Sequence, residues 1–160
     1  MSGWDSFFVA QVGASAALAG LVFVGVSINL TKIMAVADLP ARALEALVVL
    51  LCVLLASSLL LVPGQPTTLL GAEILVVGLL VWASITAIQT NTYRKVGTPY
   101  RWEYVVHIVL GQLATLAFVL AGVALLLRGA SGGYWIVPGI ICSYLDAITE
   151  AWILLIEIKR

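Results

Sequence analysis

The chain has 160 residues, of which 62% are hydrophobic and 10% are charged, and its eight basic and eight acidic residues give a net charge of +0. Soluble domains carry about 25% charged residues, so this composition excludes an ordinary soluble enzyme and a disordered protein. The balanced charge excludes a nucleic-acid binder, because no basic field attracts phosphate groups. We therefore predict a single integral membrane domain over residues 1–160.

The hydrophobic residues gather in runs that are long enough to cross a bilayer as helices. A hydrocarbon core of about 30 Å needs roughly 20 apolar residues in a helix. The predicted spans are residues 7–30, 43–62, 69–90, 104–127 and 134–156. Polar segments and segments rich in Gly and Pro separate these runs. The predicted fold class is therefore all-α, a transmembrane bundle of five helices.

The basic residues indicate how such a bundle is oriented. Seven of them fall on one side of the predicted membrane: Lys32, Arg42, Arg94, Lys95, Arg101, Lys159 and Arg160. Arg128 alone falls on the other side. The positive-inside rule then predicts that the N-terminus is outside and that the C-terminus is cytoplasmic.

The first predicted span has two different faces. One face carries candidate pore-lining residues, polar at both ends and apolar in the middle: Gln11, Ser15, Leu18, Val22 and Asn29. This pattern occurs in pore-lining helices with a hydrophobic constriction, but it favours a helix whose amides are satisfied inside a bundle. The opposite face includes Gly13, Ala17 and Gly20, small residues that let another membrane helix pack closely.

The fourth predicted span carries His107, the single histidine of the chain, about one turn inside its cytoplasmic end. His107 can pair with Glu150 or Glu157 of the fifth span, as a proton relay or as a histidine in a satisfied interface contact. Gln112 lies deeper, near the level of Asp146. The fourth and fifth spans are therefore expected to face each other at this depth.

The fifth predicted span carries acidic residues at membrane depth. Asp146 and Glu150 are four residues apart and share one face of a helix, together with Ser143, Thr149 and Glu157. A charge at this depth costs at least about 2.5–3.5 kcal/mol, so such residues usually face a protein interior or a water path. The stripe is either a pathway for cations or protons, or a buried polar contact between neutral carboxyl groups.

Residues 129–133 read Gly-Ala-Ser-Gly-Gly and match the G-x-S-x-G pattern of serine hydrolases. A serine nucleophile needs a base within reach, but His107 lies at the other end of the fourth span, about 30 Å away in a straight helix. The sequence also has no spacing typical of a metal site, a phosphate-binding loop or a dinucleotide site. We therefore predict that the protein is not an enzyme and has no metal and no cofactor.

A recognisable pattern covers most of the chain. It consists of the run from Trp4 to Leu30, Leu39-Pro40 with Arg42 and Glu45, and Pro63-Gly64-Gln65. The pattern resembles that of small bacterial, often actinobacterial, polytopic membrane proteins, some of which carry the label "modulator of FtsH protease". The resemblance implies a location in the bacterial inner membrane, and it implies neither a defined activity nor catalytic residues.

Three functions fit these features. The first is an ion channel or pathway for cations or protons, which uses the intramembrane acidic stripe in a small homo-oligomeric protein. The second is a non-catalytic regulatory or assembly subunit that binds another membrane protein through the basic and aromatic segment 93–104. The third is a binder of lipid or another hydrophobic ligand. The expected partners are the lipid bilayer, further copies of the chain and another membrane protein, and not nucleic acid.

Overall fold

The computed structural model describes residues 3–36, 38–94 and 101–159, without the side chains of residues 93, 101–104 and 155–159. The described residues form helices almost throughout and contain no strand: α1 (Asp5–Ile28), α2 (Leu30–Ala35), α3 (Leu39–Leu60), α4 (Thr67–Tyr93), α5 (Arg101–Arg128), the 3-10 helix η2 (Gly129–Trp135) and α6 (Ile136–Lys159). The predicted all-α fold class is therefore confirmed.

Local chemistry explains where several of these helices begin and end. Asn29 separates α1 from α2, and its side-chain amide donates a hydrogen bond to the Gly25 carbonyl at 3.0 Å. Pro40 lies in the first turn of α3, where its missing N–H leaves no hydrogen bond unmade. Gly64 allows the turn before α4, because its φ of +71° is accessible to glycine without strain.

Two boundaries differ from the predicted spans. The predicted first span, 7–30, runs across the break at Asn29. The predicted second span, 43–62, begins too late, because α3 starts at Leu39 and therefore includes Arg42 and Glu45. Proline in a first helical turn permits this earlier start.

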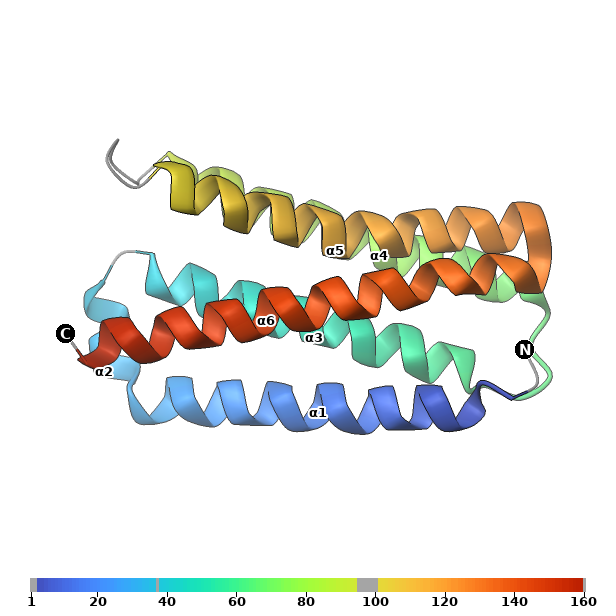
Figure 1. Cartoon of the computed structure of the whole chain (residues 1–160), viewed down its shortest axis with the longest axis horizontal. Coiled ribbons are helices and arrows are strands. Elements are labelled where there is room, and N and C mark those ends of the chain that lie inside the picture. The colour runs from blue at the N-terminus through green and yellow to red at the C-terminus, as the bar shows by residue number, and fades with distance from the viewer. Residues whose placement is uncertain (1–2, 37, 95–100, 160) are drawn as a thin grey trace.

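Several helices are long and apolar enough to cross a membrane. Among the described residues there are four such segments: 5–28, 39–60, 67–92 and 105–154. The last segment contains most of α5 and α6, which run antiparallel on either side of η2 (Figure 1). These lengths and compositions indicate a membrane protein.

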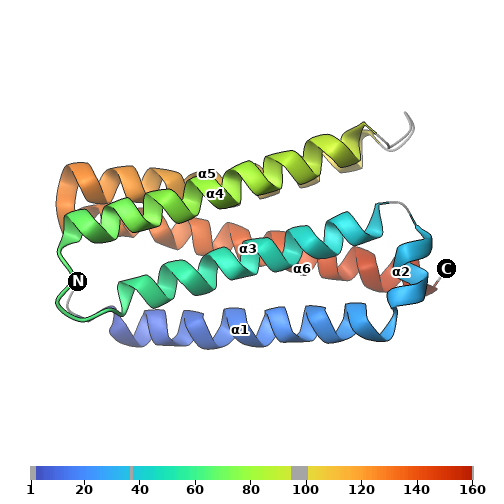
Figure 2. The ribbon, with the colours of Figure 1, turned by 180° about the vertical axis from the view of Figure 1, so that it is seen from behind.

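The helices are arranged in layers (Figures 1 and 2). Helices α4 and α5 pack along each other, α3 and α6 lie together beside them, and α1 packs on the far side of α3. Helix α1 is the most peripheral of the long helices. Its most apolar window is 11% buried, whereas that of α3 is 50% buried.

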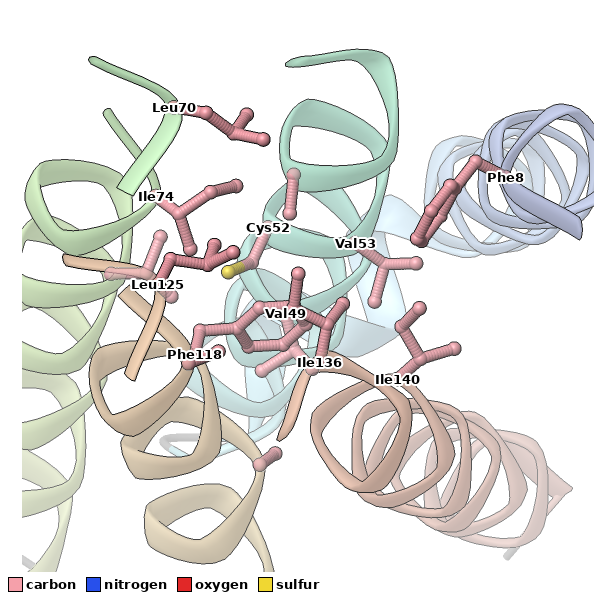
Figure 3. Packing of buried hydrophobic residues seen from close by; sticks show 14 of the residues in the cluster. Phe8, Val49, Cys52, Val53, Leu70, Ile74, Phe118, Leu125, Ile136 and Ile140 are labelled. Carbon is pink, nitrogen blue, oxygen red and sulfur yellow. The ribbon is translucent and has the colours of Figure 1, made fainter. Parts of the chain in front are cut away.

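The main hydrophobic core lies toward the end of the bundle where α4 and α6 begin, which we call the apolar end. Phe118 of α5 is packed there among Val49 of α3 and Ile136 of α6 (Figure 3). Phe8 of α1 points toward Val53 in the same cluster. These side chains are 0–1% exposed, so this end of the bundle interior is closed by apolar packing.

Glycines allow α4 and α5 to approach each other closely. A Cβ added to Gly122 would lie 2.6 Å from the Leu75 backbone nitrogen, and one added to Gly78 would lie 3.0 Å from the Val119 nitrogen. Any larger side chain would force the two backbones apart. The two helices thus form a tight pair, as small residues do elsewhere between membrane helices.

Candidate functional site

Polar side chains from α3, α4, α5 and α6 meet inside the other end of the bundle, where α3 begins and α6 ends; we call it the polar end. The polar cluster consists of Arg42, Glu45, Gln89, His107, Gln112, Asp146 and Glu150. A cavity of about 10 Å³ lies among them, and it has room for about one water molecule. Its polar lining comes from Arg42, Glu45, Gln89, Thr92, His107 and Glu150.

Glu150 is held by a cation from a neighbouring helix. Nη1 of Arg42 donates to both carboxyl oxygens of Glu150, at 3.4 and 3.2 Å, and Nε of Arg42 donates to Asp38 at 3.2 Å. Nδ1 of His107 lies 2.8 Å from Oε1 of Glu150, at the distance of an ion pair but without the geometry of a hydrogen bond. Glu150 is 1% exposed, so Arg42 compensates a charge that water cannot reach freely.

A chain of hydrogen bonds leads from α4 to a second carboxyl group. The Trp82 indole donates to Gln112 at 2.7 Å, Gln112 donates to Gln89 at 2.9 Å, and Gln89 donates to Oε1 of Glu45 at 2.5 Å. Each N–H group donates in the direction of Glu45, so the successive hydrogen bonds polarise one another. Gly111 makes room for this chain, because a Cβ there would lie 2.6 Å from Nε2 of Gln89 and 2.8 Å from Oε1 of Glu45.

Asp146 has a different environment from the other two carboxyl groups. It is 0% exposed, and within the described part of the chain neither of its oxygens has a hydrogen-bond partner. Ser143, three residues earlier on α6, is also 0% exposed, and its hydroxyl is likewise unpartnered within the described residues. Burying a carboxylate without partners costs several kcal/mol (about 1–3 kcal/mol for a neutral polar group). Asp146 is therefore the group in the cluster with the strongest need for a ligand.

The formal charges of the polar cluster do not balance. Glu45 and Glu150, and likewise Asp146 and Glu150, lie close enough to repel each other when they are ionised. Three carboxylates face one guanidinium, which leaves two excess negative charges, or one if His107 is protonated. Uncompensated buried charge is costly, so a bound proton or cation would stabilise the cluster as far as the described residues form it.

Two residues of the predicted acidic stripe, Asp146 and Glu150, belong to the polar cluster. The structure brings His107 to Glu150, one of its two predicted partners. Gln112 lies in the same region, but its hydrogen bonds run to α4 rather than to Asp146. Thr149 is half-buried and donates to the Leu145 carbonyl of its own helix at 2.6 Å. The side chain of Glu157 lies outside the described residues.

The candidate pore-lining face of α1 is packed against the rest of the chain. Gln11 accepts a hydrogen bond from the Tyr144 hydroxyl at 2.9 Å, Ser15 is 0% exposed and bonds its own helix, and Asn29 likewise bonds the helix that it follows. Leu18 and Val22 pack against α3 and α6. Within a single chain, this face is therefore a helix contact rather than the wall of a pore.

The small-residue face of α1 points away from the bundle. Gly13, Ala17 and Gly20 are exposed, and a Cβ added to Gly13 or Gly20 would have no neighbour within 4 Å. The predicted packing role of these residues can only involve another molecule. It stays a prediction.

Three members of the polar cluster, Arg42, Glu45 and Gln89, are not among the predicted site residues. Arg42 precedes the predicted second span, Glu45 lies in its first turn, and Gln89 lies at the end of the predicted third span. Arg42 and Glu45 are three residues apart and share a face of α3. A helix that begins at Leu39 places Arg42 and Glu45 on one face, just as α6 places Asp146 and Glu150 on one face.

The serine of the G-x-S-x-G pattern is hydrogen-bonded within a short helix. Residues 129–133 lie in η2, and the Ser131 hydroxyl donates to the Arg128 carbonyl at 3.0 Å. The described residues contain no group of three or more His, Cys, Asp or Glu side chains that could hold a metal ion.

Comparisons with known proteins identify no relative. No family model matches the chain, and no curated protein and no solved structure is similar to it. Evidence on function therefore comes from the polar cluster itself.

Proposed function

We propose that the protein is a small membrane protein that carries an ion, a proton or another cation, by way of the polar cluster. One observation carries this proposal: Asp146 is fully buried, and neither of its carboxyl oxygens has a hydrogen-bond partner among the described residues, inside a cluster whose described charges are negative in excess. Buried ionisable groups in membrane helices usually mark ion or proton pathways. The adjoining cavity offers an approach for water from the polar end.

The proposed topology has five spans. The apolar segment 105–154 has 50 residues, and as one straight helix it would be about 75 Å long, more than twice the thickness of the hydrocarbon core. Its reversal at η2 favours two spans, α5 and α6. The concentration of basic residues supports a cytoplasmic polar end, with the N-terminus outside. The resemblance noted above favours the bacterial inner membrane.

The apolar end limits how an ion would cross. Beyond Asp146, the bundle interior is filled by the core around Phe118, Val49 and Ile136 (Figure 3). Passage therefore requires that this packing opens, or that several copies of the chain together form the outer part of the route. Homo-oligomers are part of the proposal, because the exposed small residues of α1 suit a contact between membrane helices.

Ion flux into liposomes tests the proposal. We expect wild-type protein to dissipate an imposed proton or cation gradient, and Asp146→Asn to slow this flux by roughly tenfold, which corresponds to about 1.4 kcal/mol of added barrier. Glu150→Gln should act in the same direction. Thr149→Ala is the matched control, because its hydroxyl bonds its own helix outside the cluster. Wild-type flux no greater than that of empty liposomes, or unchanged flux in both carboxyl variants, contradicts the proposal.

A second candidate function is an assembly subunit for another membrane protein. The observation that favours it is the exposure of α1, whose most apolar window is 11% buried. A partner helix at Gly13 and Gly20 would bury this surface. Purification from native membranes should then recover a stoichiometric membrane partner, and Gly13→Leu with Gly20→Leu should release it without unfolding the chain. Recovery of no partner with the wild-type chain would count against this candidate.

A further inference from the structure

We infer that the ion handled by the polar cluster is the proton, and that Asp146 is its deepest binding group. The inference rests on the proposed function, which leaves the choice between a proton and a metal cation open. It concerns which chemistry the buried side chains can perform.

Three of the four carboxyl oxygens of Glu45 and Glu150, the two acidic residues that line the cavity, already accept hydrogen bonds. Hard cations such as calcium take six or more oxygen ligands, and smaller ones keep several waters. Both oxygens of Glu150 accept from Arg42, and Oε1 of Glu45 accepts from Gln89. The cavity has room for about one water molecule, which excludes a hydrated ion.

A proton needs none of this space. His107 lines the cavity, and its Nδ1 lies 2.8 Å from Oε1 of Glu150. Chains of His, Asp and Glu are the usual proton relays inside membranes. Hydronium in the cavity gives a proton to the imidazole of His107 and becomes water, which leaves an imidazolium. A rotation of this ring aligns its Nδ1–H with Oε1 of Glu150, and the proton then passes to that oxygen, which leaves a neutral imidazole and a neutral carboxylic acid.

Arg42 makes this step reversible. When Glu150 takes up the proton, Arg42 loses the charge of that partner, but it keeps its hydrogen bond to Asp38 at 3.2 Å. The guanidinium thus stays paired in both states. When the proton leaves, Arg42 again stabilises the Glu150 carboxylate. Among the described residues, the other titratable groups that face Glu150 are Glu45 on α3, His107 on α5 and Asp146 on α6.

Asp146 lies one helical turn beyond Glu150, about 6 Å along the axis of α6. Side chains four residues apart on a helix are neighbours, with about 5–6 Å between their Cβ atoms, so the proton can pass when the two carboxyl groups meet. A bound proton removes the charge of Asp146 and gives it a donor, which meets the need of a carboxyl group that is otherwise unpartnered among the described residues. The apolar core separates a proton on Asp146 from the apolar end of the bundle until that packing opens (Figure 3).

Two measurements on the full-length protein test the inference separately from the proposed function. Infrared difference spectra in lipid nanodiscs, recorded on acidification, should show the C=O band of a protonated carboxylic acid. Asp146→Asn should lose part of this band, and Thr149→Ala should keep it. His107→Gln should slow the appearance of the band in a pH jump without removing it. An unchanged band in Asp146→Asn, in protein that elutes as wild type does in size-exclusion chromatography, overturns the inference.

Liposome flux with separate gradients of protons, sodium and potassium completes the test. Proton flux without sodium or potassium flux supports the inference. Sodium or potassium flux without proton flux overturns it and leaves the proposed ion pathway standing. No flux of any ion removes the proposed function, whereas an infrared band that is lost in Asp146→Asn would still support proton binding at Asp146.

Discussion

The two ends of the bundle are built from the same helices but are held together by different interactions. At the apolar end, α3, α5 and α6 meet through Phe118, Val49 and Ile136, and these side chains are 0–1% exposed. At the polar end, α3, α5 and α6 meet through Arg42, His107 and Glu150 beside a cavity. Apolar packing in a membrane needs only shape, whereas buried polar groups need partners. The cost of the polar end indicates that it serves a purpose other than stability.

The largest loss of stability is expected from Arg42→Leu at the polar end. The change leaves the Glu150 carboxylate without its guanidinium in the bundle interior, which should lower the free energy of unfolding by about 3–5 kcal/mol. Reversible unfolding in mixed micelles measures this loss. The double variant Arg42→Leu with Glu150→Leu should recover most of it, because replacing a whole buried pair by apolar residues is often neutral. A double variant as unstable as the single one would contradict this account of the polar end.

The next effect concerns the contact between α4 and α5. Gly122→Ala places a Cβ 2.6 Å from the Leu75 backbone nitrogen, and such overpacking should cost about 1–3 kcal/mol of unfolding free energy. Gly20→Ala on the exposed face of α1 is the matched control, since its Cβ would have no neighbour within 4 Å. The same unfolding assay compares the two. Equal stability of both variants would show that the glycine contact is not needed.

The smallest effect is expected from Gln112→Leu, which removes the acceptor of the Trp82 indole and the donor to Gln89. Losing this part of the hydrogen-bond chain should cost about 1 kcal/mol. The emission of Trp82, measured in a variant whose other tryptophans are replaced by phenylalanine, should shift because the indole N–H loses its partner. Emission identical to that of the matched parent would mean that the indole of Trp82 does not take part in this chain of hydrogen bonds.

The sequence predicted the helices and part of the site for one reason: both are periodic. Apolar runs marked the long helices, and the spacing of Asp146 and Glu150 placed them on one face of α6. The contacts between helices leave no periodic pattern in the sequence. That Arg42 faces Glu150, 108 positions away, follows from how α3 and α6 are aligned in space, which local spacing does not encode.

The polar face of α1 illustrates the same limit. Its pattern fitted both a pore lining and a bundle contact. The packing of Leu18 and Val22 on α3 and α6, and the hydrogen bond from Tyr144 to Gln11, favour the bundle contact within one chain. Only the packed structure distinguishes the two, because both need the same residues at the same spacing.

The polar cluster is expected to exchange protons directly with the polar side of the membrane, and to reach the other side only when the apolar packing opens. Infrared spectra of uniformly oriented proteoliposomes, with the pH changed on one side at a time, distinguish the two sides. The carboxylic acid band that is lost in Asp146→Asn should respond at once to pH at the polar end and only slowly to pH at the apolar end. A faster response to pH at the apolar end, or equally fast responses to both sides, would overturn this assignment.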